Sequence, residues 1–149
     1  MSKPHELLYG GEPGGGMADF GISRLNERDA TLMVMYYAAI EQYGIDQQEW
    51  VKTMSDWDII PLKRGDLIIG GVMQRGTELH VAFQSRPTFS TRGYLRRILN
   101  STIERLGSAT TTVRAANQHG LAMCHRLGFE TVREAEGIIY LKCERARYA

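Results

Sequence analysis

The 149-residue sequence lacks several features that mark particular classes of protein. It has two cysteines, Cys124 and Cys143, and no C-x-x-C pair, which argues against a disulfide framework and a structural zinc site. Its longest apolar run, residues 32–40, is about half the length that spans a bilayer. The first sixteen residues hold Pro4, Pro13 and five glycines, and no apolar segment of the signal-peptide kind. We therefore expect a cytoplasmic protein with no membrane partner.

The sequence also has little net charge, only +1, but its charges are unevenly distributed. Residues 1–66 carry 11 acidic and 6 basic side chains, a balance of −5, and residues 67–149 carry 6 and 12, a balance of +6. Between Glu78 and Glu104 there is no acid, and four arginines cluster there: Arg86, Arg92, Arg96 and Arg97. A local cationic patch on a near-neutral protein favours a bound phosphate group over a long nucleic-acid track. The alternative for any one of these arginines is an exposed helix face.

The chain divides into an N-terminal arm and one domain. Residues 1–19 contain the run Gly10-Gly11-Glu12-Pro13-Gly14-Gly15-Gly16, which loses too much backbone entropy to become ordered without a partner. We predict a flexible glycine-rich arm over residues 1–19 and a single domain over residues 20–149.

Hydrophobic periodicity and turn residues predict an α+β domain. Strands are expected at 20–25, 57–62, 67–73, 79–86, 110–115, 129–134 and 138–143. Helices are expected from Asn26 or Asp29 to Tyr43, from Asp46 to Met54, and over 91–106 and 118–127. One strand–helix–strand unit lies among hairpins, so we predict a mixed, mostly antiparallel sheet with one parallel crossover, flanked by about four helices.

The most informative segment is Asn117-Gln-His-Gly-Leu-Ala-Met-Cys-His-Arg-Leu-Gly-Phe129, which follows a predicted strand. It resembles the end of the acetyl-CoA-binding domain of the GCN5-related N-acetyltransferases, the GNAT family. The predicted element order is also similar to that family's, over roughly residues 20–143. The resemblance implies that the chain binds acetyl-CoA or coenzyme A and transfers the acetyl group to a small-molecule or protein amine.

The family binds the coenzyme A pyrophosphate at a Gln/Arg-x-x-Gly-x-Gly/Ala motif that opens a helix. Aligned on Gly93, this sequence has Ser90 where the family has Gln or Arg, and Leu95 where it has the second small residue. The resemblance implies that the pyrophosphate is held by Thr91, Arg92, Gly93, Arg96 and Arg97. It also implies that pantetheine lies along Phe83, Gln84 and Ser85 and that the cofactor is oriented by Asn117. The alternatives are that Gly93 serves packing alone and that Leu95 faces the core.

The resemblance also implies catalytic residues. The family's general acid, usually a tyrosine, falls at Cys124, for which a small buried hydrophobe is the alternative. Its base is commonly a glutamate in or near the strand before the cradle, where this sequence offers Glu78, His80 and Gln84. His80 is a candidate because free histidine changes its protonation state near neutral pH. We predict no metal, because His119 and His125 lie on different faces of their helix.

The departures at Ser90, Leu95 and Cys124 leave a second hypothesis open, an inactive protein of the same fold. The stretch Ile69-Gly70-Gly71 and the arginine-rich helix are also similar to acetyltransferase-like internal virion or head-assembly proteins of short-tailed bacteriophages. That resemblance implies a protein assembly partner and a location in the virion. Nucleic-acid binding through Arg86–Arg97, with Phe83, Phe89 and Tyr94 as stacking platforms, is a weaker third hypothesis.

Overall fold

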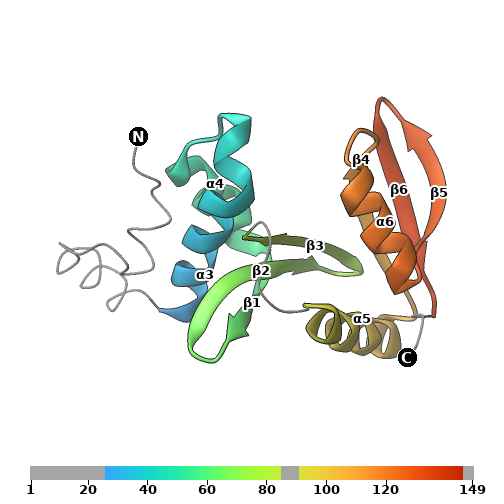
Figure 1. Cartoon of the computed structure of the whole chain (residues 1–149), viewed down its shortest axis with the longest axis horizontal. Coiled ribbons are helices and arrows are strands. Elements are labelled where there is room, and N and C mark those ends of the chain that lie inside the picture. Colours follow the sequence, from blue (N-terminus) through green and yellow to red (C-terminus); the bar gives the residue numbers. More distant parts are fainter. Residues whose placement is uncertain (1–25, 85–90, 146–149) are drawn as a thin grey trace, which may run out of the picture. The chain divides into compact units, whose positions relative to one another are not determined.

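The computed structural model describes residues 26–84 and 91–145 (Figure 1). The predicted arm and the predicted strand over 20–25 lie outside the described residues. Six strands form one sheet in the order β1-β2-β3-β4-β6-β5. They are β1 (Asp58–Arg64), β2 (Leu67–Arg75), β3 (Glu78–Phe83), β4 (Ala109–Arg114), β5 (Glu130–Ala135) and β6 (Ile138–Cys143). The α-helices of this part are α3 (Glu27–Met35), α4 (Gln47–Thr53), α5 (Arg92–Leu106) and α6 (Gln118–Leu127).

The sheet is mixed, with one parallel pair. β3 and β4 run parallel and pair at Glu78 and Thr110, whereas β6 runs antiparallel to both β4 and β5. The turns Gly65-Asp66 and Gly76-Thr77 are two residues long, a length that joins only antiparallel neighbours. The predicted α+β class, with one parallel crossover and about four helices, is confirmed.

The described residues group into two compact units, and β2 and β3 contribute to both. In the first unit (residues 26–73 and 81–84), α3 and α4 share a core built around Leu32, Met35, Trp50 and Met54. The indole Nε1 of Trp50 donates to the Leu32 carbonyl oxygen at 3.0 Å, so the ring's one polar group is satisfied inside this core.

Local signals explain the ends of the first helix. The Asn26 side chain accepts a hydrogen bond from the Asp29 amide, so Asn26 is the N-cap, and the helix begins at Glu27. After Met35 the chain continues as a π-helical turn, η1 (Tyr36–Ile40), and a 3-10 turn, η2 (Glu41–Tyr43). Gly44 ends it with a φ of 78°, a conformation that suits glycine.

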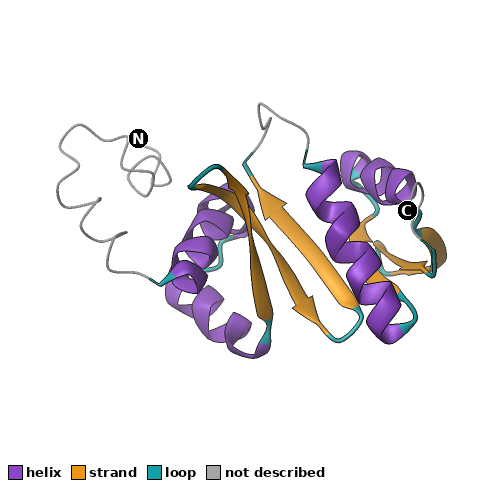
Figure 2. Ribbon diagram, turned by 90° about the horizontal axis from the view of Figure 1, so that it is seen from below, coloured by secondary structure: helices purple, strands orange, loops and turns teal. Residues whose placement is uncertain are grey.

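The second unit (residues 74–80 and 91–145) holds α5, α6 and strands β4 to β6. α5 packs against β4 and buries Leu95, Leu99 and Thr102. The Gln74 side chain donates from Nε2 to the Thr102 hydroxyl at 2.9 Å, which ties the end of β2 to this helix. Figure 2 colours these helices and strands by type.

The predicted strand ends differ slightly from the observed ones. Lys63 and Arg64 belong to β1, and Gln74 and Arg75 belong to β2, so each hairpin turn is shorter than the four residues expected. Polar and charged residues at the end of a hairpin look like a turn in sequence, although the backbone can still pair there. β3 ends at Phe83, and Ser85 and Arg86 lie outside the described residues.

Candidate functional site

The start of α5 differs from the start of the other α-helices in the described part of the chain. Asn26, Asp46 and Asn117 each accept a hydrogen bond from a first-turn backbone amide of their helices. Thr91, the buried N-cap of α5, makes no side-chain capping bond. The first amides of α5 lie at the positive end of the helix dipole, and within residues 26–84 and 91–145 no side-chain cap is recorded for them.

Gly93 lies in this first turn with open space around it. A Cβ built at Gly93 would meet no heavy atom within 4 Å, and the backbone is not in the left-handed region that favours glycine. Within residues 26–84 and 91–145, neither packing nor backbone conformation therefore requires a glycine here. The packing alternative for Gly93 finds no support among these residues, and Gly93 is exposed.

Leu95 points into the core and not into the space around Gly93. Its side chain is 8% exposed and shares a face of α5 with Leu99 and Thr102. The branched side chain in place of a small residue therefore leaves the exposed surface of the helix start uncovered. On that surface the guanidinium of Arg97 stacks over the Tyr94 ring, 4.8 Å from its centroid.

Two of the predicted catalytic residues lie together on β3. Glu78 and His80 are two residues apart, so their side chains share a face of the strand, and His80 Nε2 lies 2.6 Å from Glu78 Oε2. An ionised carboxylate can only accept, so in this hydrogen bond the His80 ring donates from Nε2 to Glu78. A carboxylate and an imidazole are both groups that can act as general bases.

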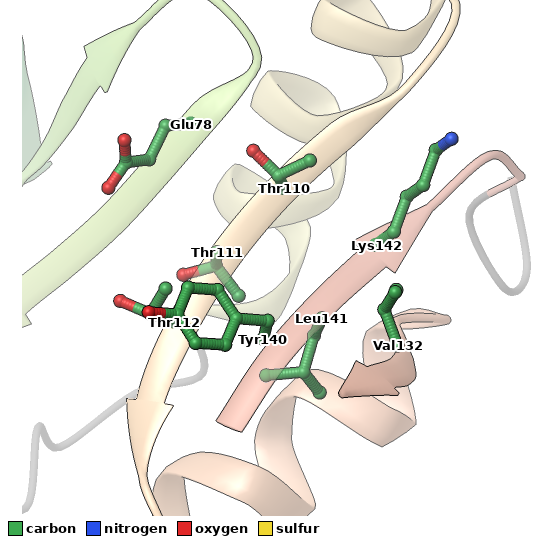
Figure 3. A pocket seen from close by; sticks show the side chains of 8 residues that line it. All are labelled: Glu78, Thr110, Thr111, Thr112, Val132, Tyr140, Leu141 and Lys142. Atoms are coloured by element: carbon green, nitrogen blue, oxygen red, sulfur yellow. The ribbon is translucent and has the colours of Figure 1, made fainter. Parts of the chain in front are cut away.

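Glu78 also lines a pocket of about 400 Å³ (Figure 3). The rest of the lining comes from β4, β5 and β6: Thr110, Thr111, Thr112, Val132, Tyr140, Leu141 and Lys142. The Tyr140 ring reaches from β6 toward β4 beside Thr112 (Figure 3). None of these seven residues was predicted as a site residue, because strand periodicity does not tell which residues of two strands lie opposite each other. A pattern of polar side chains could have indicated the site: three consecutive threonines on one predicted strand and Tyr140-x-Lys142 on another.

Cys124 is buried in α6 and is not among the residues lining this pocket. Burial raises the pKa of the Cys124 thiol to about 11. Such a thiol stays protonated at neutral pH and releases its proton reluctantly. The buried-hydrophobe alternative explains this environment well, and a role as general acid stays a prediction.

The other predicted cofactor residues have their own local partners. Asn117 caps α6, and its side-chain oxygen accepts from the Gly120 amide at 2.9 Å. Phe83 and Gln84 lie at the end of β3 in the first unit, where the Gln84 amide donates to the Ile69 carbonyl oxygen of β2. Ser85 and Ser90 lie outside the described residues.

Within residues 26–84 and 91–145, no three His, Cys, Asp or Glu side chains gather where they could hold a metal ion. Over the same ranges no helix is long and apolar enough to cross a membrane.

No protein-family model matches the sequence, and a search of curated proteins finds no relative. Solved structures do match the fold. The N-acetyltransferase PseH of Campylobacter jejuni is 13% identical, with a TM-score of 0.60 over 83% of this chain and 94% of that chain. A GNAT family acetyltransferase of Elizabethkingia anophelis, solved with acetyl-CoA bound, is 11% identical, with a TM-score of 0.55 over 74% and 88%. The chain has the GNAT fold.

An IAA acetyltransferase of Bacillus cereus is a further example, 12% identical with a TM-score of 0.57 over 76% of this chain and 91% of that chain. The fold expected from the resemblance of the Asn117–Phe129 segment is thus confirmed. The resemblance to bacteriophage assembly proteins finds no support in these comparisons.

Proposed function

We propose that this protein is an N-acetyltransferase that takes an acetyl group from acetyl-CoA and transfers it to a primary amine. The GNAT fold supports the proposal, because structures with this fold include PseH in complex with acetyl coenzyme A and the PaiA N-acetyltransferase of Thermoplasma acidophilum in complex with coenzyme A. Fold alone does not determine activity, so the argument depends on the residues of this chain.

The observation that carries the proposal is the start of α5. Thr91 gives its first amides no side-chain cap, the described residues leave open space around Gly93, and Leu95 is turned into the core. Amides at a helix N-terminus bind phosphate groups by hydrogen bonding and by the helix dipole. The inactive hypothesis drew on three departures from the family pattern, Ser90, Leu95 and Cys124. Of these, Leu95 does not obstruct the proposed phosphate site, because its side chain is buried in the core.

Arginines supply the charge that a pyrophosphate requires. Arg92, Arg96 and Arg97 all lie in the first two turns of α5, and guanidinium groups bind phosphate oxygens by paired, charge-assisted hydrogen bonds. We assign the pyrophosphate to Thr91, Gly93 and these arginines. By the resemblance, pantetheine would lie along Phe83–Ser85, and Asn117 would orient the cofactor while capping α6.

The Glu78–His80 pair provides the base. A primary amine is mostly protonated at neutral pH and must lose a proton before its nitrogen can attack the acetyl thioester, which the bound acetyl-CoA supplies. Glu78 lines the pocket, and the ring of His80 is hydrogen bonded to its carboxylate, so the pair can accept that proton beside the amine. As the new C–N bond forms, the thioester C–S bond breaks and coenzyme A leaves as its thiolate, which takes a proton from water. We leave Cys124 out of this step, because burial raises the pKa of its thiol to about 11.

The experiment that tests the proposal is a calorimetric titration of the full chain with acetyl-CoA and, separately, with coenzyme A. We expect micromolar binding of both, weakened at least about tenfold by the double substitution Arg92→Gln, Arg97→Gln. Arg126→Gln, an exposed arginine on α6, is the matched control and should leave the affinity unchanged. Absence of heat at millimolar ligand would overturn the proposal and favour an inactive protein with an assembly partner.

A further inference from the structure

Five of the pocket residues, together with Arg133, which does not line the pocket, form two rows across the strands of the second unit. In the first row Glu78 of β3 pairs with Thr110 of β4, which pairs with Lys142 of β6. In the second row Thr112 of β4 pairs with Tyr140 of β6, which pairs with Arg133 of β5. Register partners share a face of the sheet, so both rows present their side chains to the same side.

Charge changes sign across these rows. The acid, Glu78, stands on β3, the hydroxyls of Thr110, Thr112 and Tyr140 lie in between, and Lys142 stands on β6. Figure 3 shows Glu78 and Lys142 at opposite sides of the pocket with Thr110 between them. The Arg133 guanidinium stacks on the Tyr140 ring, 3.7 Å from its centroid, and adds a second cation on the same side as Lys142.

We propose that this pocket binds a small zwitterionic amine, with the amine toward Glu78 and an anionic group toward Lys142. Glu78 offers an anion to the ammonium group, Lys142 offers a cation to a carboxylate or phosphate, and the hydroxyls between them can bond either end. A purely cationic amine would leave the ammonium of Lys142 facing it, and the like charges would repel.

The size of the pocket sets the size of the ligand. Neighbouring strands lie about 4.8 Å apart, so the backbones at Glu78 and Lys142 are separated by roughly 10 Å, and both side chains extend over part of that span. Space remains for an amine and an anion a few bonds apart, as in a small amino acid. The inference rests on the proposed function in one respect, since it takes the bound amine to be the acetyl acceptor.

Lys142 has an acidic neighbour that competes with a ligand for its positive charge. Glu130 is its register partner on β5 and does not line the pocket. If Lys142 served only to pair with Glu130, removing Glu130 would change the protein as much as removing Lys142 does. The substitution Glu130→Gln therefore separates a lysine that binds a ligand from a lysine that balances a surface charge.

The test measures binding by the full chain without acetyl-CoA, so it does not depend on catalysis. The probes are β-alanine and O-phosphoethanolamine, which are zwitterions, n-propylamine, which has only the amine, and propionate, which has only the anion. Binding is followed by the amide shifts of the ¹⁵N-labelled protein. We expect one zwitterion to bind at least about tenfold more tightly than n-propylamine and propionate, and the comparison of the two zwitterions identifies the anion.

Lys142→Met should abolish that preference, while Glu130→Gln and the exposed-lysine control Lys52→Met should retain it. Equal affinity for zwitterion and n-propylamine, or a preference that survives Lys142→Met, would overturn the inference, as would absence of zwitterion binding. Coenzyme A binding without zwitterion binding would refute only this inference. Zwitterion binding without coenzyme A binding would refute only the acetyltransferase proposal.

Discussion

Gly93 shows how a single residue separates stability from function. Glycine in a helix loses more backbone freedom on folding than alanine and destabilises the helix by roughly 0.5–1 kcal/mol. Tertiary contacts often require a glycine all the same, but a Cβ at Gly93 would meet nothing within 4 Å. Gly93 therefore lowers the stability of α5 without improving any contact among the described residues. This favours a ligand that occupies the space beside Gly93.

We therefore expect Gly93→Ala to stabilise the free protein by about 0.5 kcal/mol and to weaken coenzyme A binding at least about tenfold. Urea unfolding and calorimetric titration measure the two effects. Ser101→Ala, at an exposed position further along α5, is the control, because it raises helix propensity without touching the helix start. Coenzyme A affinity unchanged by Gly93→Ala would show that the ligand does not approach this residue.

Cys124 gives a prediction about pH. Below about pH 9 the thiol is protonated in both the folded and the unfolded chain, so it adds no pH dependence. Between about pH 9 and about pH 11 the unfolded chain releases the proton while the folded chain keeps it. The free energy of unfolding then falls as the pH rises, by up to about 1.4 kcal/mol per pH unit from this group.

The substitution Cys124→Ala removes that contribution. From pH 8 to about pH 10.5 the free energy of unfolding should fall by about 2 kcal/mol less in the variant than in the parent protein. The raised pKa values of Tyr36 and Cys143 affect both proteins alike, so the difference isolates Cys124. Parallel stability curves, measured by urea unfolding over this range, would mean that the thiol is not desolvated.

At the scale of elements, two consecutive glycines of β2 set how closely its neighbours approach. A Cβ at Gly71 would lie 2.6 Å from the Met35 sulfur and 2.6 Å from the Thr31 methyl of α3, so this helix packs closely against the β2 backbone. A Cβ at Gly70 would lie 2.4 Å from Phe83 Cβ and 2.5 Å from the Ala82 carbonyl oxygen of β3. The run Ile69-Gly70-Gly71 thus has a structural explanation in close packing.

Alanine at either position should therefore destabilise the protein. We expect a loss of about 1–3 kcal/mol for Gly71→Ala, where side chains can shift, and a larger loss for Gly70→Ala, where backbone atoms stand in the way. Urea unfolding measures both, and Gly93→Ala, the same substitution in open space, should have the opposite sign. A neutral Gly71→Ala would mean that α3 can move away from β2 without cost.

At the scale of the whole molecule, a net charge of +1 gives little long-range attraction for an anionic ligand. The positive charge around α5 therefore acts only at short range. Coenzyme A carries phosphate groups that these arginines would contact at short range. We expect its affinity to fall severalfold between about 50 mM and about 500 mM salt, because the Debye length shortens from more than 10 Å to about 4 Å. Titration at the two salt concentrations measures this, and an affinity independent of salt would argue against ion pairing with the arginines.

The sequence by itself determined the elements whose ends depend on neighbouring residues. α6 begins after the cap Asn117 and ends before Gly128, which has a φ of 113°, and both bounds agree with the prediction. A cap or a left-handed glycine acts within one helical turn, so its signal is complete in a few consecutive residues. The element order and the Asn117–Phe129 segment together were enough to predict the GNAT fold.

The tertiary structure alone decided which side chains share a site. Glu78 was a candidate from the sequence, but its neighbours in the pocket, Thr110 and Lys142, were not, since they come from strands that meet only after a helical crossover and a hairpin. The same holds for the space around Gly93, whereas the burial of Leu95 was an alternative that the sequence had already offered. Register, burial and empty space depend on contacts between residues far apart in the chain, and no local pattern of residue types encodes them.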